Sequence, residues 1–365
     1  ASIMSKVFVS GCYDILHAGH IQFFKEAKES GEELIVCVPS DEVLFLCKNR
    51  RPSIPLDHKI EILKNLPFVD DVVIGDNTED IALNFEGIIE EVSADILVVT
   101  EDDAFRFKKE SLCEKIGIEY KVLPKTPPDF EPVSTSSIID NIIAPNQVPM
   151  RVDLAGGWLD VPQHARCDGF IINCAISPTV SLTNWMYEKQ SGLGGSAAWA
   201  HLNGKDAVES ELNMGVGWQD AAIIRETGLC AWKSDDQPHL SIKRNGDILK
   251  GKMALWYTGN SHNTPAYSNL VRDYDLLAAA SRTAMLGVQN NDLGMLCDAI
   301  NLNYTVQLKE GMTPLPDIGA PLAMKYCGGG HGGYALYVFS DFSFRDDFAE
   351  STVNTIKIEP YINYE

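Results

Sequence analysis

Short apolar runs alternate with longer amphipathic stretches through the first third of the chain. The runs are long enough for buried parallel strands, and they lie at Val7–Val9, Leu34–Val38, Val72–Ile74, Ile96–Val99 and Tyr120–Leu123. Between them the pattern predicts helices near residues 21–29, 57–66, 80–92 and 104–116. This order predicts a doubly wound α/β sheet with its ligand crevice at the carboxyl ends of the strands.

The segment from Ser10 to His20 reads Ser-Gly-Cys-Tyr-Asp-Ile-Leu-His-Ala-Gly-His and lies between the first predicted strand and the first predicted helix. Unpaired backbone N–H groups at a helix start bind phosphate, and a glycine lets a ligand approach closely. Two imidazoles at the same place can neutralise charge on a phosphate under attack. We therefore expect His17 and His20 to be catalytic in a nucleotide site, with nucleotide contacts from Ser10, Gly11, Cys12, Tyr13 and Gly19.

A proline-rich stretch, Lys125-Thr-Pro-Pro-Asp-Phe-Glu-Pro, and a second at Ala144-Pro-Asn-Gln-Val-Pro mark a change in pattern. We expect one domain over residues 1–143 and another over 144–365. Three glycine-bearing motifs follow in order, and each alone could be a tight turn. They are Arg151-Val-Asp-Leu-Ala-Gly-Gly-Trp-Leu-Asp160, Ser191-Gly-Leu-Gly-Gly-Ser-Ala-Ala198 and Lys325-Tyr-Cys-Gly-Gly-Gly-His-Gly-Gly333.

Composition narrows the class of protein. The 365 residues are 45% hydrophobic and 22% charged, which is typical of a globular protein with two cores. The net charge of −21 argues against nucleic acid or an anionic membrane as a partner, but not against small anionic substrates. The nine cysteines include no Cys-x-x-Cys pair, so we expect reduced thiols in a cytoplasmic protein. No signal peptide or membrane span is expected.

Residues 5–143 resemble the glycerol-3-phosphate and ethanolamine-phosphate cytidylyltransferases. The resemblance covers the Ser10–His20 segment, the loop containing Lys48, Asp57-His-Lys-Ile-Glu-Ile-Leu, Phe68-Val-Asp-Asp-Val and Val133-Ser-Thr-Ser-Ser-Ile. It implies that His17 and His20 contact the nucleotide phosphates and that Mg²⁺ accompanies CTP. It also implies that Lys48 and Lys125 hold substrate phosphates and that Thr135 and Ser136 close over the triphosphate.

Two positions depart from that family. Lys59 stands where the family usually has an arginine, so a point charge replaces a planar fork. Thr100-Glu-Asp-Asp stands where many members have Gly-Asp-Asp or Gly-Glu-Asp, so the contacts to the base, and the choice between CTP and ATP, stay open at this point.

The three later motifs together resemble the GHMP small-molecule kinases, closest to the fucokinase and heptose 1-kinase branch. The resemblance implies an α+β fold that uses ATP and Mg²⁺, with Asp220 as the general base and Arg151 on the transferring phosphoryl group. Asp160, Gly156, Gly157, Gly329 and Gly330 would contact the sugar. The nucleotide would lie on Gly192, Gly194, Gly195 and Ser196. Mg²⁺ would lie on Ser196 and Glu209, with Glu211 as second choice.

The second domain also shows departures. Asp220 could be a helix cap instead of a base. The segment between Asp160 and Gly192 is shorter than in the family, and Gly195 replaces its usual second serine. The shortening predicts a compact domain in which the purine is held weakly or by another subunit.

Together the two halves predict a bifunctional homo-oligomeric enzyme that phosphorylates a sugar and transfers a nucleotide to a sugar or alditol phosphate. Its partners would be small molecules. Two alternatives stay open. The carboxy-terminal half could be a non-catalytic dimerisation and sugar-sensing domain beside a single cytidylyltransferase, or the whole chain could be a nucleotide-binding regulator.

Overall fold

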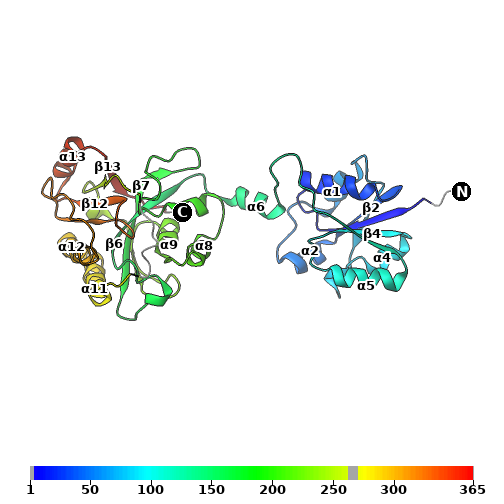
Figure 1. Cartoon of the computed structure of the whole chain (residues 1–365), viewed down its shortest axis with the longest axis horizontal. Coiled ribbons are helices and arrows are strands. Elements are labelled where there is room, and N and C mark those ends of the chain that lie inside the picture. Colours follow the sequence, from blue (N-terminus) through cyan, green and yellow to red (C-terminus); the bar gives the residue numbers. More distant parts are fainter. Residues whose placement is uncertain (1–3, 262–269, 365) are drawn as a thin grey trace. The chain divides into compact units, whose positions relative to one another are not determined.

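The computed structural model describes residues 4–261 and 270–364, and the chain divides into two compact units, Ala1–Ile139 and Asp140–Glu365 (Figure 1). Each unit has its own sheet and its own core. Helix α6 (Thr135–Ile143) spans the division between them. The boundary expected after residue 143 stays a prediction.

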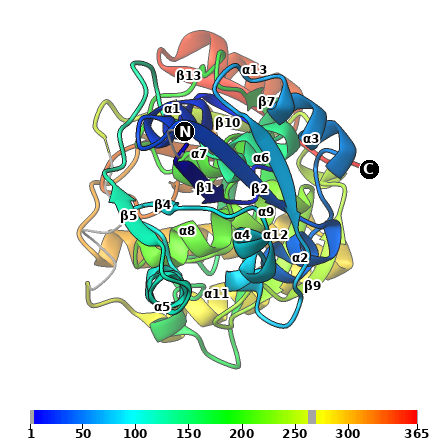
Figure 2. The same cartoon turned by 90° about the vertical axis from the view of Figure 1, so that its right-hand side faces the viewer.

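The first unit contains a five-stranded parallel sheet in the order β3-β2-β1-β4-β5. Figure 2 shows β5, β4, β1 and β2 beside one another in this order. All five predicted strands are present, as β1 (Lys6–Ser10), β2 (Glu33–Pro39), β3 (Asp71–Gly75), β4 (Ile96–Thr100) and β5 (Glu119–Leu123). The doubly wound fold predicted from the sequence is therefore confirmed.

Helices cover both faces of this sheet because successive strand residues point to opposite sides. Val7 and Val9 join one core cluster, while Phe8 between them joins the other. The first cluster includes residues of α1 (Ala18–Lys28) and α3 (Leu56–Lys64), and the second includes residues of α4 (Glu86–Glu91) and α5 (Arg106–Ile116). Helix α2 (Asp41–Lys48) was not predicted, and the helix predicted over 80–92 is divided into a 3-10 turn, Ile81–Leu83, and α4.

The second unit has the predicted α+β fold, and its sheet has eight strands. The described strands pair antiparallel in the order β11-β12-β10-β13-β7-β8-β9, with β6 also on β7. They are β6 (Val148–Ala155), β7 (Phe170–Val180), β8 (Leu229–Lys233), β9 (Leu240–Arg244), β10 (Met253–Tyr257), β11 (Ala323–Tyr326), β12 (Tyr334–Val338) and β13 (Thr355–Pro360).

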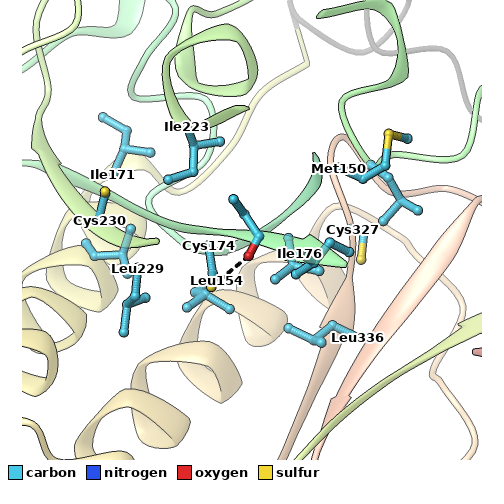
Figure 3. Close-up of a cluster of buried hydrophobic side chains, with 14 of the residues drawn as sticks. Met150, Leu154, Ile171, Cys174, Ile176, Ile223, Leu229, Cys230, Cys327 and Leu336 are labelled. Atoms are coloured by element: carbon cyan, nitrogen blue, oxygen red, sulfur yellow. Dashed lines mark hydrogen bonds between the residues drawn. The ribbon is translucent and has the colours of Figure 1, made fainter. Parts of the chain in front are cut away.

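Small and branched side chains fill the core of this unit. The helices are α7 (Gly195–Leu202), α8 (Ala207–Asn213), α9 (Gln219–Glu226), α11 (Tyr274–Asn290), α12 (Leu293–Lys309) and α13 (Phe342–Ser351), with 3-10 turns at Pro162–His164 and Asp247–Leu249. Figure 3 shows Met150 and Leu154 of β6 packed with Cys174 and Ile176 of β7 and Ile223 of α9. The core therefore fixes β6, which carries the first glycine motif, against the helix that carries Asp220.

All nine cysteines are free, and six of them are buried. Burial raises the pKa of the Cys230 and Cys327 thiols to about 12. Across residues 4–261 and 270–364, every helix is too short or too polar to cross a membrane.

Candidate functional sites

The two histidines lie where β1 gives way to α1. His17 is the residue that caps the helix, and its Nδ1 accepts a hydrogen bond from Gly19 N at 3.2 Å. Nδ1 of His20 accepts from His17 N at 3.4 Å, so the two side chains and two backbone groups form a capping box. The rings stack with centroids 3.8 Å apart. Both imidazoles are thus held by the same helix start that can bind an anion.

This arrangement determines which nitrogen carries the proton. Because each Nδ1 accepts from a backbone N–H, the neutral form of each ring has its proton on Nε2. Burial lowers the pKa of His17, and burial together with the nearby His17 lowers that of His20 to about 4. Near pH 7 both rings are neutral donors in the free protein, and an anion at Nε2 would favour their protonation.

A cavity of about 1030 Å³ opens in front of these rings. The structure brings together there every residue predicted for the first site. Its lining includes His17, His20, Ser10, Gly11, Cys12, Tyr13, Gly19, Lys48, Lys125, Thr135 and Ser136. Gly11 is required by space, because a Cβ there would lie 2.7 Å from Tyr13 Cζ.

The structure shows where the two lysines predicted for this cavity lie. Lys48 is the last residue of helix α2 rather than part of a loop, and Lys125 donates to Asp102 Oδ2 at 2.5 Å. Arg50 also lines the cavity and was missed. It donates to Asp14 Oδ2 at 2.5 Å, and its position just after Lys48 was the available signal.

Lys59, which stands where the related family usually has an arginine, is buried. Its Nζ lies 3.5 Å from Asp14 Oδ1 and it is not part of the cavity lining. Burial opposes the charged form of Asp14, but its bonds to Arg50 and Ser53 and the charge of Lys59 lower its pKa. Lys59 therefore holds Asp14, which in turn holds Arg50 at the cavity.

In the second unit, Arg151 of β6 and Asp220 of α9 form an ion pair. Arg151 Nε donates to Asp220 Oδ1 at 2.6 Å, and NH1 donates to Gly192 O at 2.6 Å. Burial opposes the charge of Arg151, but Asp220 and Asp153 outweigh it and raise the pKa. Asp220 is the second residue of α9, after the cap Trp218, so it is not the helix cap that the sequence left open.

A second buried pair, Asp153 and Lys325, was missed by the sequence analysis. Lys325 Nζ donates to Asp153 O and Oδ2, both at 2.8 Å, and its side chain is 0% exposed. Asp153 Oδ1 accepts from Arg151 NH1 at 3.2 Å and from Gly328 N at 2.8 Å. Asp153 thus joins the first motif to the third, and Lys325 and Arg151 overcome burial to lower its pKa.

Glu211, and not Glu209 as the sequence favoured, lies beside Ser196 where the Mg²⁺ ligand was predicted. Glu209 is exposed on α8, and its backbone N–H is bonded by the cap Asp206. Glu211 is buried and accepts from Ser196 Oγ at 2.6 Å. Two residues along a helix rotate the side chain by about 200°, so only one of the two can face α7. Burial, with the nearby charge of Asp220, raises the pKa of Glu211 to about 7.

Asp160 is buried beside this network. Its Oδ2 accepts from Gln219 N at 3.0 Å and its Oδ1 from Gln219 Nε2 at 3.4 Å. Burial, and more weakly Asp220, raises its pKa to about 6. Its partner Gln219 immediately precedes Asp220 in the chain. A contact between Asp160 and the sugar stays a prediction.

The glycines of the three motifs divide into two groups. Gly194 precedes α7 at φ +79°, and a Cβ there would lie 3.2 Å from Arg151 Cγ and 3.3 Å from Asp220 Cβ. The loop therefore crosses directly over the ion pair. Gly192, Gly195 and Ser196 line a second cavity, of about 750 Å³.

The glycines predicted to contact the sugar differ in exposure. Gly156 packs against β7, where a Cβ would lie 1.9 Å from Phe170 O. Gly157 is partly exposed beside Asp153 and Gln219. Gly329 and Gly330 are buried, and a Cβ on Gly330 would lie 2.4 Å from Met312 Sδ. A sugar contact at these glycines stays a prediction.

Known proteins resemble the chain in separate parts. The sequence model of the family described as cytidylyltransferase-like matches residues 8–141. FAD synthase of Pyrococcus abyssi is 42% identical over 120 residues, covering 32% of this chain and 78% of that protein. FAD synthase of Thermococcus kodakarensis is 35% identical over 142 residues, covering 38% and 91%. Bifunctional protein HldE of Alcanivorax borkumensis is 32% identical over 139 residues, covering 37% and 27%.

Solved kinase structures resemble the carboxy-terminal part. Leishmania major mevalonate kinase, in complex with R-mevalonate, is 15% identical with a TM-score of 0.43, covering 60% of this chain and 96% of that one. A putative sugar kinase from Campylobacter jejuni is 14% identical with a TM-score of 0.40, covering 59% and 94%.

Proposed function

The chain belongs to the cytidylyltransferase-like family through residues 8–141, and from this we propose that its first unit is a nucleotidyltransferase. In the proposed reaction, an oxygen of a sugar or alditol phosphate attacks the α-phosphorus of CTP. The bond from that phosphorus to the bridging oxygen breaks, and pyrophosphate leaves.

The cavity before His17 and His20 supports this reaction. The attacking phosphate oxygen is already anionic near pH 7, so the protein needs no general base. It needs positioned donors for the charge that develops on the phosphoryl oxygens. The two imidazoles present N–H donors beside the start of α1, and Lys48, Arg50 and Lys125 lie around the same cavity.

For the second unit we propose ATP-dependent phosphorylation of a sugar hydroxyl. A neutral hydroxyl does need a base, and Asp220, with a side chain 19% exposed, reaches the surface of the site. Arg151, 3% exposed, is fixed by Asp220, Asp153 and Gly192 O, so its guanidinium is preorganised toward a phosphoryl group. Asp160 and Gln219 lie beside this pair, where sugar hydroxyls would bind.

The residues of the second unit fit Mg²⁺. Ser196 Oγ and a buried Glu211 carboxylate lie 2.6 Å apart, and oxygen donors are those that Mg²⁺ prefers. When bound, the ion would neutralise charge on the nucleotide phosphates. Glu211 without a cation is costly to ionise, and its raised pKa expresses this.

The two activities would form a sequence in which the kinase makes the sugar phosphate and the transferase consumes it. The resemblance to a protein named bifunctional supports this reading. The observation that carries the proposal of two activities is that each unit has its own candidate phosphate site. These sites are the cavity at His17 and His20 and the Arg151–Asp220 pair beside the glycine loop. We further propose a cytoplasmic homo-oligomer with small-molecule partners and no nucleic acid or membrane partner.

A second candidate concerns the nucleotide of the first unit. The two FAD synthases described above resemble the first unit, and FAD contains adenine. This favours ATP as the nucleotide donor in the first unit. The alternative with one activity also stays, with the second unit as a dimerisation and sugar-sensing domain.

One assay separates these candidates. The full-length protein is incubated with γ-labelled ATP, CTP and Mg²⁺, and with free heptoses, fucose or alditol phosphates. We expect sugar-dependent ADP formation, and pyrophosphate release that requires CTP and a sugar or alditol phosphate. Pyrophosphate without ADP indicates the single-activity alternative, and absence of both products contradicts the proposal.

A further inference from the structure

The second cavity extends from Ser196 and Glu211, the proposed Mg²⁺ ligands, to two tryptophans. Ser196 and Glu211 lie in its lining together with Trp185, which precedes the glycine loop, and Trp199, one helical turn after Ser196 on α7. Its volume of about 750 Å³ is within the range of sites that hold a nucleotide-sized ligand. Asp220 and Asp160, where the sugar would bind, lie outside this lining.

Trp185 lies against the glycine loop itself. A Cβ on Gly195 would be 3.4 Å from Trp185 Cζ2, so the loop leaves room for no more than a methyl group on that side. The glycine that replaces the second serine of the motif thus admits the indole ring. Trp199 contacts Trp185 edge to face, with ring centroids 6.4 Å apart and 62° between the planes.

The exposure of the Trp199 ring and the hydrogen bonding of the Trp185 ring are both unusual. Trp199 is 54% exposed, although a large aromatic side chain usually becomes covered in a folded protein. Trp185 Nε1 is buried and has no hydrogen-bond partner within the described residues. A buried indole N–H without a partner is uncommon, because such donors normally find an acceptor. The cavity therefore has a flat aromatic wall formed by Trp185 and Trp199.

We propose that Trp185 and Trp199 form a stacking site for the base of the nucleoside triphosphate that donates the phosphoryl group. This inference rests on the proposed kinase function and adds the means of recognising the base. With the phosphates at the start of α7 and at Ser196 and Glu211, the base extends along the cavity to the indoles. Every base has a flat π-face that stacks on an aromatic ring.

The position along the cavity favours a base over a sugar ring. A sugar must place its hydroxyl beside Asp220, across the glycine loop from the tryptophans, because Gly194 lies directly over Asp220 and Arg151. The donor nucleotide approaches the same phosphoryl group from the opposite side, as an in-line transfer requires. An added Cβ on Gly194 would face Asp220 and one on Gly195 would face Trp185, so we place the tryptophans on the nucleotide side of the loop.

The experiment compares ATP with tripolyphosphate, which has the phosphates without a base. Both are added with Mg²⁺ to the full chain, and hydrogen exchange is measured over residues 191–202, because the first unit could also bind ATP. We expect Trp185→Ala to weaken protection by ATP about tenfold or more in concentration, from the usual strength of one base stack. Protection by tripolyphosphate should be unchanged, and Trp185→Phe should remain close to the wild type.

Two further variants make the test specific. Trp199→Ala should weaken ATP protection less than Trp185→Ala. The control Phe342→Ala removes another exposed aromatic ring of the same unit, 67% exposed and outside the cavity, and should change nothing. Equal protection by ATP in wild type and Trp185→Ala overturns the inference while leaving the kinase proposal intact. So does an equal loss for ATP and tripolyphosphate, or a loss of sugar affinity alone. If neither compound protects the wild type, the kinase proposal fails and the inference fails with it.

Discussion

The two proposed phosphate sites are built by different physical means. In the first unit the proposed donors at the start of α1 are backbone N–H groups and two imidazoles that are neutral near pH 7, and Lys48, Arg50 and Lys125 line the same cavity. In the second unit the proposed donor is Arg151, a permanent charge that is buried with Asp153 and Lys325 among three motifs that lie far apart in the chain. A site made of buried charges exists only when the whole unit has folded, because unpaired charges inside are costly.

The difference follows the chemistry proposed for each unit. In the reaction proposed for the first unit the nucleophile is already anionic, so no carboxylate base is needed. In the reaction proposed for the second unit a neutral hydroxyl must lose a proton, so a carboxylate base is expected, and Asp220 is paired with Arg151 there.

The largest effect is expected from removing the carboxylate. Asp220→Asn should reduce sugar-dependent ADP formation by about 10³-fold or more, since a general base contributes on this scale. Nucleotidyl transfer from a supplied sugar phosphate should be unchanged, because the site lies in the other unit. Both rates are measured on the same preparation. The exposed Asp236→Asn in the same unit is the control, and a parallel loss of both activities would contradict the separation of the sites.

Next in size is the loss of an imidazole. His20→Ala should slow nucleotidyl transfer by about 100-fold, roughly 3 kcal/mol, by removing one donor from the transition state. Pyrophosphate release measures this, and sugar-dependent ADP formation should continue at the wild-type rate. The exposed His58→Ala serves as the matched control. Pyrophosphate release at the wild-type rate in His20→Ala would remove the histidines from the mechanism.

A smaller effect separates the two nucleotides. With Mg²⁺, CTP should raise the melting temperature of the first unit by a few degrees more than ATP, through preferential binding to the folded state. The difference should disappear in His17→Ala, while protection of residues 191–198 by ATP should persist. Greater protection of the first unit by ATP, lost in His17→Ala, would assign it to the adenylyl side.

The smallest effect is a pH dependence confined to the first unit. The pKa of His20 falls from its ordinary value near 6.5 to about 4 on folding, because of burial and the nearby His17. The unfolded chain therefore binds more protons between pH 4 and 6.5, so the stabilisation is complete above pH 6.5 and lost as the pH falls toward 4. Urea unfolding at pH 5 and 7.5 should show a smaller difference in His20→Gln than in the wild type or His58→Gln. An unchanged difference in His20→Gln would contradict a buried neutral ring.

The same contrast explains what the sequence could predict. The three inner strands of the first sheet, β1, β2 and β4, are continuous apolar runs because helices bury both faces, and all five strands were located. The residues predicted from the contiguous Ser10–His20 segment also line one cavity. Helix α2 was missed because Phe45 and Leu46 are exposed, each 51%, which hides the helical periodicity.

The second site could be predicted only in part. Asp153 and Lys325 each lie within a buried strand and are 172 positions apart, so no local pattern pairs them. The choice between Glu209 and Glu211 depends on which face of α8 packs on α7, and neighbouring carboxylates on one short helix give no sign of it. Long-range packing, rather than residue type, decided these positions.

The backbones of the second and third glycine motifs pack directly against each other. A Cβ on Gly192 would lie 2.4 Å from Cys327 O, and one on Gly333 would lie 2.3 Å from Ser191 O, while Tyr334 N donates to Ser191 O at 2.8 Å. We therefore expect the two loops to unfold locally as one cooperative segment, so that their amides exchange with solvent together. For anyone grafting this phosphate loop into another scaffold, the transferable unit is the pair of loops, since either one alone would lose the surface that sets its shape.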